Sequence, residues 1–204
     1  MSYSDFTLPK ISKTFSLIIQ EKAEIFSHIP PIDLDPYFQN YLKNNIPLAQ
    51  AIGTEKAKSE MIIAPVLIET RQLLNNQISL FSGIDFNVDI EQGLNGFCDF
   101  ILSLSPQQLY LVSPVIALVE AKNDNLKSGL AQCIAEMFAA QLFNLAENNN
   151  IKTVYGVVTN GNQWQFLRLV DHQVEIDITD YYISQPEKII GILVHVIRLE
   201  KQDN

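Results

Sequence analysis

Apolar and polar positions follow a helical spacing through the first part of the chain. The pattern predicts three helices there, over residues 10–29, 35–46 and 54–76. Pro30 ends the first of these, and Asp35 and Pro36 supply the N-cap and the first position of the second. Pro65 predicts a start or a kink within the third, because a proline inside a helix removes a backbone hydrogen bond. We therefore expect residues 1–54 to form a helical extension ahead of the core.

From residue 84 onward the period shortens toward two, which indicates strands. Strands are predicted over residues 84–90, 96–104, 109–121 and 153–161, followed by a hairpin pair over 163–170 and 174–178. Helices are predicted over residues 125–149 and 185–201. Residues 109–121 are almost continuously apolar, as in a central strand covered on both faces, with a bulge or break at Pro114. This order predicts an α/β fold with a mixed central sheet flanked by helices on both faces.

The chain has 204 residues, which is enough for a single domain with a sizeable core. After the N-terminal extension we expect a core over residues 55–170 and a C-terminal strand and helix over residues 171–204. Residues 189–197 (IIGILVHVI) are apolar nearly all round the predicted helix. This segment is therefore expected to be buried, either against the core or in a homodimer interface.

Charge and cysteine content limit the partners and the compartment. The net charge is −9 at pH 7, and a protein of this kind does not attract polyanions through its overall field. Any binding of nucleic acid must then rest on a local site or on bound cations. Cys98 and Cys133 offer neither a disulfide framework nor metal-ligand spacing, which favours a reducing, cytoplasmic location. No apolar segment reaches the length of a membrane span, so no membrane partner is expected.

Three ionisable residues stand at positions where a strand is expected to be buried. Asp99 lies inside the strand FCDFIL, and Glu120 and Lys122 lie at the end of the next strand. Neighbouring strands lie ~4.8 Å apart and alternate residues share a face, so these side chains can converge in one cleft. Two carboxylates and an ammonium group in a half-buried cleft are costly unless a cation offsets the charge. Mg²⁺ or Mn²⁺ suits such a site, because Mg²⁺ binds through one or two carboxylates and keeps waters for a phosphate substrate.

This arrangement resembles the PD-(D/E)XK nuclease superfamily, whose fold is restriction-endonuclease-like. The matching residues are Asp99 in GFCDF and Glu120-Ala121-Lys122 in VEAK, and Cys98 stands where the motif often has proline. The order of helix, three strands, helix and strand also matches. The resemblance implies that Asp99, Glu120 and the main-chain carbonyl of Ala121 hold the metal. It also implies that Lys122 serves the attacking water.

Two weaker matches come from the helices. Many members of the superfamily carry a glutamate on the first core helix, for which Glu60 is our choice and Glu69 the competitor. Many also carry a glutamine on the helix after the lysine strand, and Gln132 matches it, ten residues after the lysine. Residues 157–169 (VVTNGNQWQFLRL) resemble the end of the core in the N-terminal nuclease domain of type I restriction R subunits. The resemblance covers residues 55–170 and leaves the N-terminal helices without a counterpart.

Ordinary structural roles stay open for each of these residues. Glu120 and Lys122 also suit a strand end that reaches solvent, with the two charges neutralising each other. Glu60 suits the first turn of a helix, where the helix dipole favours an acid. Gln132 also suits a surface amide, and Glu136, one turn later, is expected on the solvated face of the same helix.

The resemblance implies a metal-dependent nuclease that cuts DNA, or less favourably RNA, by in-line attack of a metal-activated water. Residues 59–170 contain five basic and ten acidic residues, too few cations to hold a duplex through phosphate contacts alone. Such an enzyme would act with a DNA-binding partner, as a homodimer, or on small or single-stranded substrates. The alternative is a catalytically weak or inactive protein that keeps the nuclease fold and binds a partner or regulates it. Metal binding distinguishes the two hypotheses.

Overall fold

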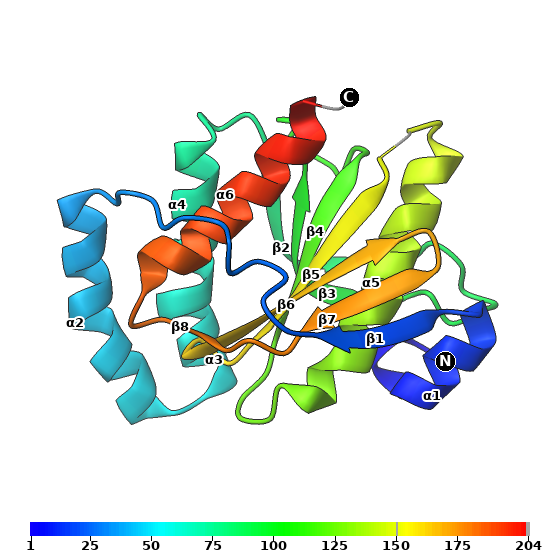
Figure 1. The fold of residues 1–204 in the computed structure, drawn as a ribbon, viewed down its shortest axis with the longest axis horizontal. Coiled ribbons are helices and arrows are strands. Elements are labelled where there is room, and N and C mark those ends of the chain that lie inside the picture. Colours follow the sequence, from blue (N-terminus) through cyan, green and yellow to red (C-terminus); the bar gives the residue numbers. More distant parts are fainter. Residues whose placement is uncertain (150, 203–204) are drawn as a thin grey trace.

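A mixed β-sheet forms the centre of the molecule in the computed structural model, which describes residues 1–149 and 151–202 (Figure 1). Within these residues the sheet has eight strands in the order β1-β7-β6-β5-β4-β3-β2, and β8 pairs with β6 beside this path. The strands are β1 (Ile18–Lys22), β2 (Ser79–Asp85), β3 (Phe97–Ser103), β4 (Val115–Ala121), β5 (Thr153–Thr159), β6 (Gln163–Val170), β7 (Gln173–Asp177) and β8 (Tyr181–Tyr182). β3 runs antiparallel to β2 and β4, whereas β4 and β5 are parallel and are joined through a helix.

Helices cover both faces of the sheet. They are α1 (Leu8–Phe15), α2 (Pro36–Ile52), α3 (Glu55–Lys58), α4 (Ala64–Leu73), α5 (Lys127–Ala146) and α6 (Pro186–Gln202), with a 3-10 turn η1 (Tyr3–Asp5) and a π turn η2 (Ser59–Ile63). α1 and α5 pack together on one face, over a core that includes Leu118 and Cys133. α2, α4 and α6 lie on the other face, over a core that includes Val119 and Ile190 (Figure 1). The predicted α/β fold with a mixed sheet between helices is confirmed.

Most predicted elements lie close to their predicted positions. Asp35 caps α2 by accepting a hydrogen bond from the Tyr37 N–H at 2.7 Å, and Pro36 is the first residue of the helix. The strand predicted over residues 109–121 is confirmed only from Val115, because β4 begins directly after Pro114, where a break was expected, and is buried along its whole length. Residues 109–114 are not part of a strand, and Leu109 and Tyr110 are exposed. The predicted strands over 96–104 and 153–161, the hairpin over 163–178, and the helices over 125–149 and 185–201 correspond to β3, β5, β6 with β7, α5 and α6.

The first predicted helix is wrong beyond Phe15. Ser16 takes a left-handed conformation (φ 54°) and ends α1, with its N–H bonded to the Ser12 carbonyl. Residues 18–22 then form β1, which pairs in parallel with β7 and bonds to backbone groups that β7 would otherwise leave open. Most side chains of β1 are exposed, so the strand shows no clear alternation and its sequence pattern resembles that of a helix. Residues 1–54 are therefore not wholly helical, because they add an edge strand to the sheet.

The strand predicted over residues 84–90 is wrong in its bounds. β2 covers Ser79–Asp85 and pairs antiparallel with β3 along that length. The residues after Asp85 do not pair with β3. They form a turn that is closed by an isolated bridge between Asp89 and Leu94. The Asp89 side chain accepts a hydrogen bond from the backbone N–H three residues later at 3.0 Å. An aspartate that bonds to nearby backbone in this way favours a turn over a strand.

The helix predicted over residues 54–76 is interrupted near Pro65, as expected. α3 leads into the π turn η2 and then into α4, where Pro65 is the second residue. Proline has no N–H to bond to the carbonyl four residues earlier, and the wider turn just before it accommodates the lost bond. Because a π turn adds a residue, side chains before and after it do not follow one helical period.

α6 is buried, as its apolar composition predicts. Ile189, Leu193 and Ile197 are at most 1% exposed and pack with α4 and the sheet. Gly191 permits a close approach of the chain, because a Cβ there would lie 2.7 Å from the Pro30 carbonyl oxygen. Among residues 1–149 and 151–202, no helix combines the length and the apolar character that crossing a membrane requires.

Candidate functional site

β3 and β4 stop pairing near the end of β4, and Asp99 bridges them there. The paired residues extend as far as Phe100 on β3. Just beyond, Asp99 Oδ2 accepts a hydrogen bond from the Ala121 N–H at 2.8 Å. On its other side β4 stays attached to β5, because the Lys122 N–H donates to the Thr159 carbonyl at 2.8 Å. The Asp99 carboxylate is therefore fixed beside the last residues of β4.

Glu120 and Lys122 extend from the face of β4 that α5 covers. They share this face with Leu118, which belongs to the core beneath α5, because alternate residues of a strand point the same way. Lys122 Nζ forms an ion pair with Glu120 Oε1. The Glu120 side chain is 1% exposed, whereas that of Lys122 is 22% exposed. The carboxylate thus lies inside the protein, and the ammonium group lies between it and the surface.

α5 extends this ion pair into a longer chain of polar side chains. Lys122 Nζ also donates to Gln132 Oε1 at 3.3 Å. Gln132 Nε2 in turn donates to Glu136 Oε1 at 3.1 Å. Gln132 and Glu136 lie one turn apart on the face of α5 that packs on β4 and β5. Gln132 therefore connects the ammonium group to a second buried carboxyl group.

The two buried glutamates, Glu120 and Glu136, hold protons more tightly than ordinary glutamates. Burial, with the negative charge of Asp99, raises the pKa of Glu120 to about 7, although Lys122 acts in the opposite direction. Burial and the charge of Glu120 raise the pKa of Glu136 well above its usual value. The Oε2 atoms of Glu120 and Glu136 are buried, and neither has a hydrogen-bond partner in the part of the chain that the structure describes. A proton on Glu136 removes the repulsion between the two carboxylates and turns one of its oxygen atoms into a hydrogen-bond donor.

Lys122 keeps its charge in this setting. Burial lowers its pKa, but the negative charges of Glu120, Asp99 and Glu55 outweigh burial, so the pKa of Lys122 is raised. Glu55 is the first residue of α3, and the Thr54 side chain caps this helix. Sequence reasoning missed Glu55. The sequence feature that could have identified it is its position directly after a threonine N-cap, because the first core helix begins there, close to Lys122.

Gly129, near the start of α5, makes room for the Lys122 side chain. A Cβ at this position would lie 2.8 Å from Val158 Cγ1 and 3.0 Å from Lys122 Cγ. Contacts this short force a shift, and the aliphatic part of Lys122 passes directly under the helix backbone. The lack of a side chain at Gly129 is therefore part of how the sequence positions the ammonium group.

Substitution of Gly129 by alanine is expected to lower the free energy of unfolding by up to about 2 kcal/mol. Overpacking costs ~1–3 kcal/mol, and the better helix propensity of alanine returns about 1 kcal/mol. Urea unfolding measures the change, with Lys127→Ala as the control at the exposed first residue of the same helix. A Gly129→Ala protein that is more stable than the wild type would contradict this packing.

The predicted residues separate into a connected group and outlying ones. Hydrogen bonds and an ion pair connect Glu120, Lys122 and Gln132, and Asp99 is bonded to the adjoining backbone. Glu60 lies exposed on η2, with its carboxylate 3.1 Å from the Lys56 ammonium, and no described contact joins it to the group. Its competitor Glu69 is on α4, in the helical layer on the other face of the sheet.

The prediction for Glu136 is wrong, since this residue is 0% exposed rather than solvated. Its neighbours Ala135, Met137 and Ala139 are also 0% exposed, so α5 is buried around most of its circumference. A helix that is apolar all round is buried, and this composition was the signal available in the sequence. A surface role for Gln132 does not fit either, because both ends of its amide are hydrogen-bonded within the protein.

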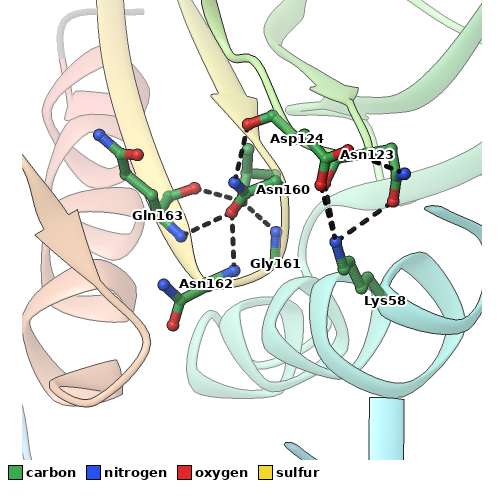
Figure 2. Close-up of polar contacts among 8 residues, drawn as sticks. Lys58, Asn123, Asp124, Asn160, Gly161, Asn162 and Gln163 are labelled. Atoms are coloured by element: carbon green, nitrogen blue, oxygen red, sulfur yellow. Dashed lines mark hydrogen bonds and ion pairs between the residues drawn. The ribbon is translucent and has the colours of Figure 1, made fainter. Parts of the chain in front are cut away.

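A second set of polar contacts holds the loop that follows Lys122 (Figure 2). Lys58 Nζ donates to the Asn123 carbonyl at 2.7 Å and lies 3.9 Å from the Asp124 carboxylate. Asn160 Nδ2 donates to the Asp124 carbonyl at 3.1 Å, from the turn between β5 and β6. Gly161 takes φ +82° there, a left-handed conformation that glycine adopts without strain. The loop is thus tied both to α3 and to the hairpin, which keeps the end of β4 in place.

No protein-family model matches this chain, and no curated protein matches it either. Its function must therefore be inferred from the residues themselves.

Proposed function

We propose that this protein is a metal-dependent hydrolase of phosphodiester bonds, with DNA as its substrate, as its resemblance to the PD-(D/E)XK nucleases implies. One observation carries the proposal. Asp99 is fixed beside the end of β4, where Glu120 and Lys122 form an ion pair that continues through Gln132 on α5. An acid from one strand, an acid and a lysine from the next, and a glutamine from the following helix are the components that the resemblance requires.

The oxygen atoms of this cluster suit a hard divalent cation. Asp99, Glu120 and the main-chain carbonyl of Ala121 would hold it, and the buried Glu120 Oε2, which has no described hydrogen-bond partner, would gain one. In the part of the chain that the structure describes, no group of three or more Asp, Glu, His or Cys side chains is arranged as a metal site. Two carboxylates suffice for Mg²⁺, which usually keeps several waters. When bound, Mg²⁺ or Mn²⁺ would lower the pKa of a water and offset phosphate charge.

Lys122 supplies positive charge beside these acids. Its raised pKa keeps the ammonium group protonated at neutral pH, so it acts as a hydrogen-bond donor and not as a base. From this position it orients the attacking water and stabilises negative charge that develops on the phosphate. Gln132 accepts a hydrogen bond from the same ammonium group and holds it toward the site. Gln132 is thus a positioning residue.

The overall charge of −9 means that the substrate is not held by a general electrostatic field. Binding to DNA would depend on local contacts near the site. A single strand or a short end fits this requirement better than a long duplex, because fewer phosphates have to be contacted. A DNA-binding partner or a second copy of the chain would supply further cations.

The test compares cleavage of single- and double-stranded DNA and RNA by wild type and Asp99→Asn, each with Mg²⁺, Mn²⁺ or EDTA. The asparagine keeps an oxygen for the Ala121 N–H but loses the charge, so we expect cleavage to fall by ~100-fold or more. Asp171→Asn is the control, since Asp171 is an exposed turn residue between β6 and β7. Cleavage that survives EDTA, or that Asp99→Asn leaves intact, would refute the proposal.

One observation favours the alternative, a nuclease-fold protein without activity that acts on a partner. The ion pair with Lys122 already compensates the buried Glu120 carboxylate without a metal ion. Calorimetric titration of Mn²⁺ into wild type and Asp99→Ala separates the two proposals. Heat that saturates in wild type and disappears in Asp99→Ala supports the hydrolase. No heat in wild type supports the partner-binding protein.

A further inference from the structure

Residues of α2 and α4, together with Asp35, line a cavity. Both helices belong to the layer opposite α5 (Figure 1). The volume of the cavity is about 410 Å³, within the range of small-molecule pockets in proteins. The residues that determine its chemistry are Asp35, Tyr37, Phe38, Tyr41, Ile68 and Glu69. The cavity takes no part in the proposed phosphodiester chemistry, because α4 packs on the other face of the sheet from Glu120 and Gln132.

Aromatic rings form much of the cavity wall. Phe38 and Tyr41 lie almost parallel, with their planes 8° apart and their centroids separated by 6.5 Å. Tyr37 is 82% exposed at the rim of the cavity. The faces of aromatic rings carry partial negative charge, so a wall of this kind attracts cations that shed their water easily.

Glu69 adds a full negative charge to this wall. Glu69 is only 8% exposed. No residue in the described part of the chain forms a hydrogen bond or an ion pair with its carboxyl group. Burial, reinforced by the negative charge of Asp35, raises the pKa of Glu69. Asp35 itself is committed to the Tyr37 N–H, which it caps at 2.7 Å. A charged carboxyl group without a partner is costly in a residue that is this little exposed, and the open space that it lines is the cavity.

We infer that this cavity binds a small alkylated ammonium ion, with the ring faces of Phe38 and Tyr41 against its methyl groups and the Glu69 carboxylate as its counter-ion. No lysine or arginine lines the described cavity, so nothing in its wall repels a cation. A primary ammonium or a metal ion would need several oxygen atoms to replace its water. An alkylated ammonium ion needs only charge and apolar contact, and the wall supplies both.

Calorimetric titration at about pH 8 tests this inference with two ligands. One is choline, and the other is 3,3-dimethylbutan-1-ol, the uncharged alcohol in which carbon replaces the choline nitrogen. We expect choline to bind at least tenfold more tightly than the alcohol. Glu69→Gln, which keeps the shape of the side chain, should weaken choline binding at least tenfold. Asp35→Asn should weaken it by a smaller factor, and an asparagine still caps α2. Glu147→Gln, an exposed glutamate after α5, is the control and should leave the affinity unchanged.

Three results would overturn the inference: no heat with choline or with tetraethylammonium, equal affinity for choline and the alcohol, or full affinity in Glu69→Gln. Circular dichroism melting verifies that each variant is folded before titration. Because Asp99 is not part of this cavity, Asp99→Asn should bind choline as the wild type does. Loss of cleavage in that variant with choline binding retained separates this inference from the proposed hydrolase activity.

Discussion

Replacement of Lys122 by methionine is expected to destabilise the folded protein by about 2–3 kcal/mol at pH 8. Methionine keeps much of the apolar length of lysine but leaves Glu120 Oε1 without its ion pair. Removing one partner of a fully buried ion pair costs ~3–5 kcal/mol, because the remaining charge is buried and uncompensated. Glu120 is 1% exposed, but Lys122 is 22% exposed, so water near the ammonium position reduces the cost.

The same substitution should be much less harmful at low pH. Loss of the ammonium group raises the pKa of Glu120 above its present value of about 7, so the carboxyl group is neutral at about pH 5. A neutral carboxyl group needs no counter-charge. Urea unfolding in EDTA at both pH values measures the difference, with Lys127→Met as the control on exposed surface. Equal destabilisation at the two pH values would show that Glu120 does not depend on Lys122 for charge compensation.

Cleavage should fall in Lys122→Met by ~100-fold or more, comparable to the loss of a donor that stabilises developing negative charge. The assay is run under conditions in which unfolding curves show the variant to be folded. Gln132→Ala should have a smaller effect on the rate constant, because it removes the residue that positions the ammonium group and leaves the charge in place. A variant with normal cleavage and reduced stability would leave Lys122 with a purely structural role.

The strand residues of the candidate site could be predicted because strand periodicity is short and simple. Glu120 and Lys122 are two positions apart, so they had to share a face wherever the strand lay. Asp99 was placed beside them by the order of adjacent strands, and its bond to the Ala121 N–H agrees with that placement. The buried run that ends at Ala121 identified the central strand for the same reason, since both of its faces are covered.

The helical contributions could not be predicted with the same certainty. The π turn η2 adds a residue between Glu55 and Glu69, so counting by a regular helical period cannot tell which glutamate faces the site. Glu60 falls within that turn and lies at the surface. Glu136 was missed for another reason. α5 is apolar around most of its circumference, so its sequence has no polar face from which an inward-pointing glutamate stands out.

β1 illustrates a further limit of sequence patterns. Its side chains are mostly exposed, and what determines its conformation is backbone pairing with β7, which is more than 150 residues away along the chain. No local pattern encodes that pairing. The chain before it shows genuine helical spacing, and only the left-handed conformation of Ser16 separates the two elements.

The wild-type protein is expected to lose stability as the pH rises from about 5 to about 8, and Glu136→Gln is expected to remove much of that loss. The pKa values of Glu120 and Glu136 are both raised in the folded state. The folded protein therefore holds protons that the unfolded chain has released, and its stability declines as pH rises through the folded pKa. For Glu120, raised to about 7, the decline is on the order of 3 kcal/mol.

Glu136→Gln changes this dependence of stability on pH directly. Glutamine has no charge at any pH, so the variant loses the part of the decline that comes from Glu136, whose pKa burial and the charge of Glu120 raise well above its usual value. The variant should be more stable than the wild type by roughly 1–3 kcal/mol at pH 8 and should gain little at pH 5. Glu175 does not disturb the comparison. Despite its burial, its contacts with Arg168 and Lys22 lower its pKa, so its contribution is complete by about pH 5.

Urea unfolding of wild type and Glu136→Gln across this pH range, in EDTA, measures the effect, and Glu147→Gln is the matched control at an exposed position. If wild-type stability is flat or increases toward pH 8, the pKa values of the two glutamates are not raised in the folded protein. If Glu136→Gln is the less stable protein at pH 8, its carboxylate is stabilised by charge and not by a proton. Either outcome would require Lys122 to compensate both acids, because it is the cation bonded to this chain of side chains in the described structure.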